Sequence, residues 1–222
     1  MKTIIKYELV INKALRSALN YDTPDEQINE FIRFFGKHIG SDRIYIFEDC
    51  DEKHVTKNTY EWCADGIVPE IHELQNVDMD IIGWWYQAFG SEKNIIITDI
   101  EQIKDEHRES YNLLKAQNVK NLVVCPIHYK DEIKGFFGVD NPPESDTLGL
   151  TTFLDMIGTL LISLLKLRNS FTKSNKEAML SSYSSLSSIY ISMALVNVQT
   201  HRYHIVKTLD EVVHFMGVKP QS

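Results

Sequence analysis

The stretch GFFGVDNPP, residues 135–143, is the starting point for interpreting this sequence. The apolar residues of this stretch belong to a longer run, Glu132 to Val139, which predicts a β-strand. Another apolar run, Asn121 to Ile127, predicts a strand just before it, and the turn-like YKD at 129–131 joins the two. Proline has no N–H group to donate to a ladder, so we expect the sheet to end at Pro142.

Two more strands are expected upstream of this pair. Residues 44–47 are followed by a polar turn at 48–53, and residues 56–64 alternate through Tyr60 and Trp62. This pattern predicts a hairpin. The β-branched run at 94–98 predicts a further short strand.

Helices are predicted on either side of these strands. Residues 7–39 have the apolar spacing of two helices, separated at YDTP, residues 21–24. Either Asp22 or Thr23 can cap the second helix, Pro24 suits its first position, and Gly40 suits its end. Helical patterns recur near 81–89 and 104–117. The sequence therefore predicts an α+β fold, an antiparallel sheet flanked by helices, with long helices at both termini.

The long apolar helix expected from Thr147 to about Arg168 has several possible roles. Spacings of four and three residues, typical of a coiled-coil seam, separate its apolar residues: Leu150, Leu154, Ile157, Leu161 and Leu164. A homodimer through this seam and packing of the helix on its own domain are both open, and both can hold. A membrane span is disfavoured because Asp155 interrupts the run and the uncharged part is too short.

The remainder of the chain differs in composition. Residues 169–188 are rich in serine and predict a linker or an exposed helix. Residues 189–222 predict one hairpin and one short helix, which are too few elements to bury a core. We therefore expect a first domain at 1–168, a linker at 169–188, and the truncated start of another domain at 189–222.

Composition excludes several classes of protein. The chain has 222 residues, a formal charge of −8 and 43% hydrophobic residues, so it is expected to be globular and to avoid nucleic acid and anionic membranes. Its three cysteines lack CxxC spacing, and its eight histidines are scattered. We expect no metal site, no catalytic residue and no cofactor. The N-terminus does not resemble a signal peptide, so a cytoplasmic location is expected.

Several segments together resemble the sensory GAF domains of bacterial signalling proteins. They are YEWCADGI at 60–67, LQ at 74–75, Trp84 or Trp85, ITDI at 97–100, residues 111–119 and, above all, FFGVDNP at 136–142. The resemblance covers residues 20–167. Domains with these local motifs look like those placed ahead of diguanylate cyclase modules, often with a PAS-like domain between. Residues 187–216 are similar to the opening of such a PAS-like unit.

That resemblance implies a sensor with a pocket between the sheet and the helices and loops that cover one face. The ligand-binding candidates that it implies are Tyr60, Trp62, Ile67, Trp84, Trp85, Phe89, Tyr111, Cys125, Phe137 and Asp140. Such an aromatic set suits a planar or apolar ligand better than a phosphate. Each aromatic residue could instead be plain core. For Asp140 we expect a turn role at the strand end, with reach into the pocket as the alternative.

The function expected from this resemblance is signal input, in which pocket occupancy controls a cyclic-di-GMP synthesising output module beyond this chain. This chain is not expected to be an enzyme, because it lacks the Gly-Gly-Asp-Glu-Phe cyclase signature. A ligand-free dimerisation module is the alternative. Less favoured is a free methionine sulfoxide reductase, which would need Cys63 and Cys125 to lie close together and a thiol with a lowered pKa.

Overall fold

The computed structural model describes residues 2–91, 93–129, 132–143, 154 and 157–178. The chain divides into two compact units, Met1–Arg168 and Asn169–Ser222. In the second unit the described residues, 169–178, form an exposed helix. The PAS-like segment expected at 189–222 lies outside the described residues. None of the described helices combines the length and apolar character that a membrane crossing requires.

The first unit has an α+β architecture, as the sequence predicts. Its elements are α1 (Lys2–Ala18), α2 (Pro24–Ile39), β1 (Arg43–Cys50), β2 (Val55–Cys63), β3 (Val77–Asp78), α3 (Gly83–Phe89), β4 (Ile95–Ile97), α4 (Arg108–Ala116), β5 (Leu122–Tyr129) and β6 (Glu132–Asp140). Short 3-10 helices lie at Asp51–Lys53, Met79–Ile82 and Ile100–Ile103. The strand β3 was not predicted, and α4 begins four residues later than the pattern at 104–117 indicated.

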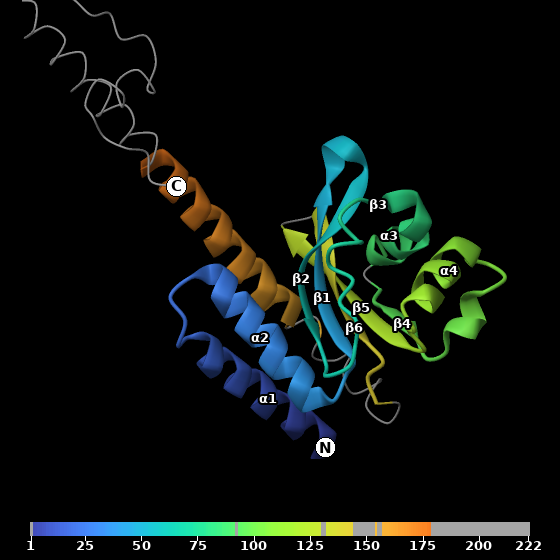
Figure 1. Ribbon diagram of the computed structural model, residues 1–222, viewed down its shortest axis with the longest axis horizontal. Helices are drawn as coiled ribbons and strands as arrows, with labels where there is room; N and C mark the ends of the chain where they lie inside the picture. The colour runs from blue at the N-terminus through green and yellow to red at the C-terminus, as the bar shows by residue number, and fades with distance from the viewer. Residues whose placement is uncertain (1, 92, 130–131, 144–153, 155–156, 179–222) are drawn as a thin grey trace, which may run out of the picture. The chain divides into compact units, whose positions relative to one another are not determined.

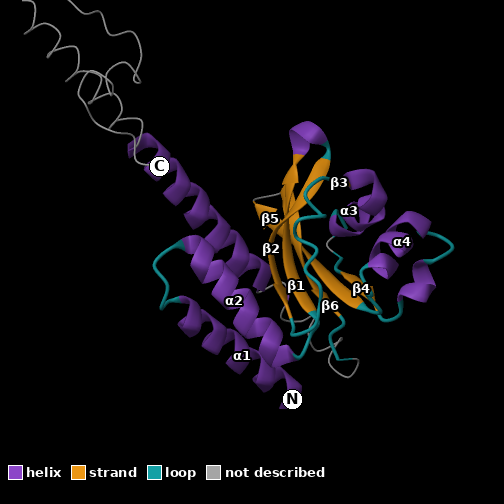
Figure 2. Ribbon diagram, in the orientation of Figure 1, coloured by secondary structure: helices purple, strands orange, loops and turns teal. Residues whose placement is uncertain are grey.

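The six strands form one sheet in the order β3-β2-β1-β6-β5-β4, with every neighbouring pair antiparallel. The two predicted hairpins, β1–β2 and β5–β6, are both present. Helices α1 and α2 cover one face of this sheet, and α3 and α4 lie on the other (Figures 1 and 2). Because both faces are covered, alternate residues of each central strand enter two different cores.

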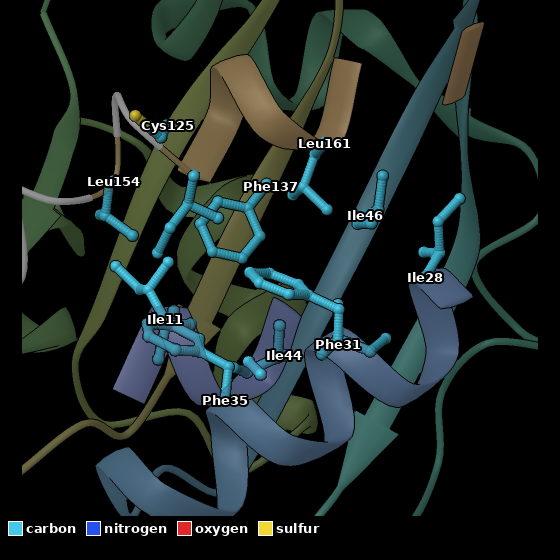
Figure 3. Close-up of a cluster of buried hydrophobic side chains, with 14 of the residues drawn as sticks. Ile11, Ile28, Phe31, Phe35, Ile44, Ile46, Cys125, Phe137, Leu154 and Leu161 are labelled. Carbon is cyan, nitrogen blue, oxygen red and sulfur yellow. The ribbon is translucent and has the colours of Figure 1, made fainter. Parts of the chain in front are cut away.

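The core under α1 and α2 also receives the C-terminal helix of the first unit, residues 157–168 (Figure 3). Helix α2 begins as the sequence predicts: Thr23 caps it in a capping box with Glu26, Pro24 follows, and Gly40 ends it in the left-handed conformation. Its buried face includes Phe31 and Phe35, which pack against the sheet.

The C-terminal helix is part of this core. Leu154, Ile157 and Leu161 are each 0% exposed and pack within their own domain, and Leu164 is half-buried against the same cluster. The structure thus supports the alternative in which the predicted seam packs on its own domain. Leu150, the first seam residue, lies outside the described residues.

Candidate functional site

A cavity of about 40 Å³ lies between the sheet and the α3–α4 side of the first unit. We call it the inner cavity. Its lining residues are Arg43, Tyr45, Phe47, Asn58, Glu61, Leu74, Val77, Ile82, Trp85, Leu113, Leu114, Gln117, Phe136 and Asp140. One end of this set is polar and the other is apolar and aromatic. At the aromatic end Phe47 stacks on Phe136 with ring centroids 4.7 Å apart, and Trp85 meets Phe136 edge to face at 5.5 Å.

Arg43 organises the polar end, because strand register brings two carboxylates to it. In the register of β1 with β6, Arg43 lies opposite Asp140. In the register of β1 with β2, the next residue of β1 that faces the cavity, Tyr45, lies opposite Glu61. The Arg43 Nη1 atom lies 3.1 Å from Asp140 Oδ2, and Nε lies 3.3 Å from Glu61 Oε1. All three side chains are at most 3% exposed. This is a buried cluster of one cation and two carboxylates.

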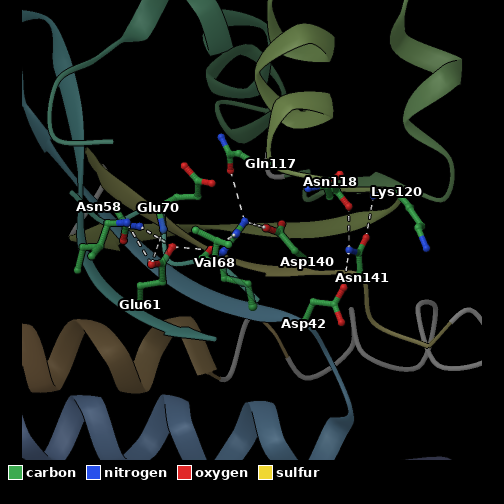
Figure 4. A network of polar contacts seen from close by, with 12 residues as sticks. Asp42, Asn58, Glu61, Val68, Glu70, Gln117, Asn118, Lys120, Asp140 and Asn141 are labelled. Atoms are coloured by element: carbon green, nitrogen blue, oxygen red, sulfur yellow. Dashed lines mark hydrogen bonds and ion pairs between the residues drawn. The ribbon is translucent and has the colours of Figure 1, made fainter. Parts of the chain in front are cut away.

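Backbone and amide groups complete the contacts of this cluster. The Arg43 guanidinium donates through Nη2 to the Val68 carbonyl at 2.9 Å and through Nη1 to Gln117 Oε1 at 3.4 Å. The Glu61 carboxylate accepts hydrogen bonds from the backbone N–H groups of Glu70 and Ile71, at 2.9 and 3.0 Å. Figure 4 shows these contacts drawing the 66–71 loop onto the strands. Glu61 therefore holds that loop in place.

Burial raises the pKa of Asp140 to about 7, even though the Arg43 guanidinium and the Tyr45 hydroxyl oppose that shift. Burial and the neighbouring Asp140 charge likewise raise the pKa of the Tyr45 hydroxyl. The Tyr45 ring lies over Gly138, where an added Cβ would overlap it. Asp140 is thus a carboxyl group that changes charge near neutral pH inside a closed site.

Four buried polar atoms on the inner-cavity wall have no hydrogen-bond partner among the described residues. They are Arg43 Nε, which has only its ionic contact with Glu61, and Asn58 Oδ1, Trp85 Nε1 and Asp140 Oδ1. Their residues are 3%, 1%, 3% and 2% exposed, so bulk water does not serve these atoms directly. A buried polar atom left unpaired costs about 1–3 kcal/mol. Their convergence on one cavity indicates that the cavity is built to hold something polar.

A second cavity of about 110 Å³ lies next to the first. We call it the outer recess. Its lining residues are Asp42, Arg43, Gly66, Ile67, Val68, Glu70, Gln117, Asn118, Val119, Asp140 and Asn141. Arg43, Gln117 and Asp140 line both cavities, so these three side chains form the partition between them.

Asn141 has the turn role that was expected of Asp140. Its backbone is left-handed (φ 50°), its Oδ1 accepts from the Lys120 N–H at 2.7 Å, and its Nδ2 donates to Asp42 Oδ2 at 2.7 Å (Figure 4). Asp140, in contrast, points into the cavity toward Arg43. The turn role expected for Asp140 is therefore wrong, and the alternative, reach into the pocket, is what the structure shows.

The ten candidates implied by the resemblance are divided between four places. Trp85 and Asp140 line the inner cavity, and Ile67 lines the outer recess. Phe89, Tyr111 and Trp84 belong to the α3–α4 core without lining either cavity. Trp84 joins two helices by donating to Ser110 Oγ at 3.0 Å and stacking on His107, and the Tyr111 hydroxyl donates to Glu101 at 2.9 Å.

The other four candidates lie on the opposite face of the sheet, which corrects that part of the expectation. Tyr60, Cys125 and Phe137 are in the core under α1 and α2, and Trp62 packs against it (Figure 3 shows Cys125 and Phe137). The reason is strand alternation. Phe136 and Asp140 face the cavity, so Phe137 faces α2, and on β2 Glu61 faces the cavity, so its neighbours Tyr60 and Trp62 do not.

Sequence reasoning missed the polar wall, made by Arg43, Asn58, Glu61 and Gln117. The available signal was the polar residues at alternate positions of otherwise apolar strands. An Asn or Glu in the middle of a strand buried on both faces needs a partner, and that requirement marks a site.

Comparisons with known proteins place this architecture. No family model matches the sequence. Over 127 residues, which is 55% of this chain, it is 24% identical to the methanogenesis regulatory histidine kinase FilI of Methanothrix harundinacea, and the match spans 14% of that kinase. The phycocyanobilin-bound GAF domain of a cyanobacterial phytochrome superposes with a TM-score of 0.55 at 17% identity, covering 71% of this chain and 94% of that one. The fold is that of a GAF domain.

The same fold is shared with an enzyme, so the thiols need separate treatment. The free methionine-R-sulfoxide reductase of Neisseria meningitidis matches this GAF fold with a TM-score of 0.55 at 9% identity, covering 75% of this chain and 92% of that one. Here β1 and β6 separate Cys63 on β2 from Cys125 on β5. At about 4.8 Å per strand their backbones are roughly 14 Å apart, beyond the reach of a disulfide.

The surroundings of Cys63 do not favour an activated thiol. Burial and the Glu61 carboxylate raise the pKa of Cys63, which disfavours the reactive thiolate. The buried Cys125 Sγ donates to Asn94 Oδ1 at 2.9 Å. The proximity of the two cysteines that the reductase alternative requires is therefore contradicted.

Proposed function

We propose that residues 1–168 are the signal-input GAF domain of a signal-transduction protein, which binds a small molecule at the inner cavity and passes its occupancy to the C-terminal helix. Four buried polar atoms without a hydrogen-bond partner on the wall of one cavity support the binding step. The cavity has room for a few water molecules, at roughly 10–15 Å³ each. A bilin like those in the phytochrome relatives does not fit this space, so we do not propose one.

The observation that carries the proposal is the adjacency of Phe47 and Glu48 on β1. Phe47 forms the cavity wall, and Glu48 on the opposite face binds Arg168 on the C-terminal helix through two contacts of 2.7 Å. The Tyr60 hydroxyl accepts from Arg168 at 3.1 Å and donates to Asp25 on α2. A ligand that displaces Phe47 therefore shifts the strand that anchors this helix. It can do so only by binding the two arrangements with different affinity.

The output lies outside the first unit and is also a proposal. The sequence motifs favour a cyclic-di-GMP synthesising module as the output domain. The similarity to FilI favours a histidine kinase as the second candidate. Conversion of GTP or autophosphorylation from ATP by the full-length protein separates the two. A homodimer through faces of the terminal helices that the core leaves uncovered remains part of the proposal.

Native mass spectrometry of the freshly purified protein tests the binding step. A small molecule retained in the native spectrum and released on denaturation supports the sensor and identifies its ligand class. The same spectrum reports dimerisation. A clean apo mass, combined with no binding from a metabolite mixture, favours the ligand-free interaction module instead.

The coupling step is tested on the anchor of the C-terminal helix. Arg168→Met keeps the length of the side chain and removes both contacts with Glu48. We expect amide hydrogen exchange in residues 157–168 to accelerate by about tenfold, because a charge-assisted contact contributes about 1.5–3 kcal/mol. Lys173→Met, which breaks the exposed pair with Glu177, is the matched control and should leave that region unchanged. Equal exchange in both variants contradicts the coupling.

A further inference from the structure

The two cavities contain many more acidic than basic groups. Around the partition the charged side chains are Arg43, Glu61, Asp140, Asp42 and Glu70, which is one cation against four carboxylates. The α3–α4 side contributes only neutral lining residues, such as Trp85 and Gln117. With every carboxyl ionised, these five side chains sum to −3. An anion would have to enter against this field, whereas a cation would be attracted by it.

The hydrogen-bond inventory indicates the same preference. A guanidinium has five N–H donors. The Nη atoms of Arg43 already contact Asp140, Gln117 and the Val68 carbonyl, and its Nε, which makes no hydrogen bond, faces Glu61 Oε1 at 3.3 Å, so each nitrogen is already directed at an acceptor of this protein rather than at an incoming anion. The atoms left without a partner among the described residues include two acceptors on the inner-cavity wall, Asn58 Oδ1 and Asp140 Oδ1. These acceptors require N–H or O–H donors.

The apolar end of the cavity sets the shape of the ligand. Phe47 and Phe136 stack nearly parallel, and Trp85 stands almost perpendicular to Phe136, with interplanar angles of 12° and 81°. Aromatic faces attract cations, and aromatic edges accommodate flat rings. The unpartnered donor at this aromatic end, Trp85 Nε1, is available for an acceptor on the same ligand.

We propose, resting on the proposed function above, that this site selects a small flat organic cation, such as an aromatic amine or amidine. Its N–H donors lie against Asp140 and Asn58, and its ring lies against Trp85 and Phe136. The partition residues Arg43 and Gln117 shift to join the outer recess to the inner cavity. The ligand has on the order of ten non-hydrogen atoms, the space of about ten waters across both cavities.

Three probes of equal shape and different charge test the selection: benzamidine, benzamide and benzoate. Each is titrated at pH 8 into ¹⁵N-labelled protein while the indole N–H signals are followed, and Trp85→Phe assigns the Trp85 signal. We expect benzamidine to shift that signal saturably, with an affinity at least tenfold higher than that of benzoate. Equal or tighter binding of benzoate overturns the inference, as does the failure of all three probes to bind.

Two variants locate the effect at the partition. Asp140→Asn removes one carboxylate and should weaken benzamidine binding about tenfold. Gln117→Glu adds a carboxylate at a half-buried position, so it should fold normally and should tighten benzamidine binding while further excluding benzoate. If Asp140→Asn fails to fold, Gln117→Glu still decides the matter, because unchanged benzamidine affinity in that variant contradicts a charge-selected site.

The result separates the inference from the proposed function. If benzamide or benzoate binds in preference to benzamidine, the sensor stands and only the cationic class is wrong. If no probe binds but native mass spectrometry shows a retained molecule, the sensor again stands. If no probe binds and no molecule is retained, both proposals fail.

Discussion

Asp140 shares the Arg43 cation with Glu61, and this arrangement determines how the domain responds to pH. Two buried carboxylates beside one guanidinium leave excess negative charge in a region of low dielectric. Burial is the larger effect, and it keeps the proton on Asp140 up to a pKa of about 7. The Glu61 carboxylate accepts hydrogen bonds from two backbone N–H groups in addition to its contact with Arg43.

We predict that the ionisation of Asp140 makes the folded domain less stable as pH rises from about 4 to about 7. The folded carboxyl retains its proton in that range, whereas the unfolded carboxyl, with its ordinary pKa near 3.8, has lost it. Protonation therefore stabilises the fold, and the contribution is lost as pH rises through 7. Asp140→Asn, which mimics the neutral form, should lack this loss of a few kcal/mol.

Urea unfolding of both proteins at pH 5, 6, 7 and 8 measures this effect. The difference in free energy of unfolding, wild type minus variant, should fall from pH 5 to pH 7 and level off by pH 8. Parallel pH profiles for the two proteins would show that Asp140 does not titrate in this range. Comparing slopes rather than absolute values removes the constant cost of losing the ion pair with Arg43.

The composition of the site could be predicted from sequence only where strand phase did not matter. Trp85, Ile67 and Asp140 were predicted at the site and line the two cavities. On β6, however, the prediction named Phe137 where the structure places Phe136 at the cavity. On β2 it named Tyr60 and Trp62 where the structure places Glu61. Alternation shows that neighbouring residues face opposite sides, but it does not show which side holds the ligand when helices cover both. The ion pair of Arg43 with Asp140 depended on register between distant strands, which no local pattern reveals.

At the scale of elements, local signals were sufficient wherever they acted through the backbone. A cap at Asp22 or Thr23, Pro24 in the first turn and Gly40 at the end of the helix were readable because each suits the unpaired groups of a helix end, and the structure places the cap at Thr23. The two-residue β3 was not readable, since it forms only when the loop after β2 folds back against Val55 and Thr56. The packing of a helix on the sheet was readable only in part, and Gly36 on α2 is an example.

We predict that Gly36→Ala destabilises the domain although it improves helix propensity. A Cβ at Gly36 in α2 would overlap the Trp62 ring on β2, so the helix or the ring must move. Overpacking of this kind costs about 1–3 kcal/mol, against a propensity gain of about 1 kcal/mol. Thermal or urea unfolding should therefore show a net loss of stability.

The matched control is Gly83→Ala at the start of α3. Its added Cβ meets nothing within 4 Å and its backbone is ordinarily helical, so stability should stay the same or rise. Combining Gly36→Ala with Trp62→Leu should restore part of the lost stability. A Gly36→Ala variant that is as stable as the Gly83→Ala control would show that Trp62 does not pack on α2.

At the scale of the whole molecule, the sheet separates the two cavities from the C-terminal helix. The inner cavity lies on the side of α3 and α4, while α1, α2 and residues 157–168 form the core on the other face. In the proposed function, any signal must therefore cross β1, β2, β5 or β6. The α+β class and both hairpins followed from sequence periodicity. The role of the C-terminal helix did not, because a stripe with coiled-coil spacing fits a partner helix and a domain core equally well.

Ile157 distinguishes these two roles, since it lies at the centre of the stripe and is 0% exposed within its own domain. We predict that Ile157→Glu unfolds the first unit, because an unpaired carboxylate in an apolar core costs several kcal/mol, comparable to the whole stability of a domain. Circular dichroism and urea unfolding measure it. Ser163→Glu, at an exposed position of the same helix, should remain folded. If Ile157→Glu instead gives a folded monomer while the unmutated protein is a dimer, the stripe joins two chains and the core assignment of this helix is wrong.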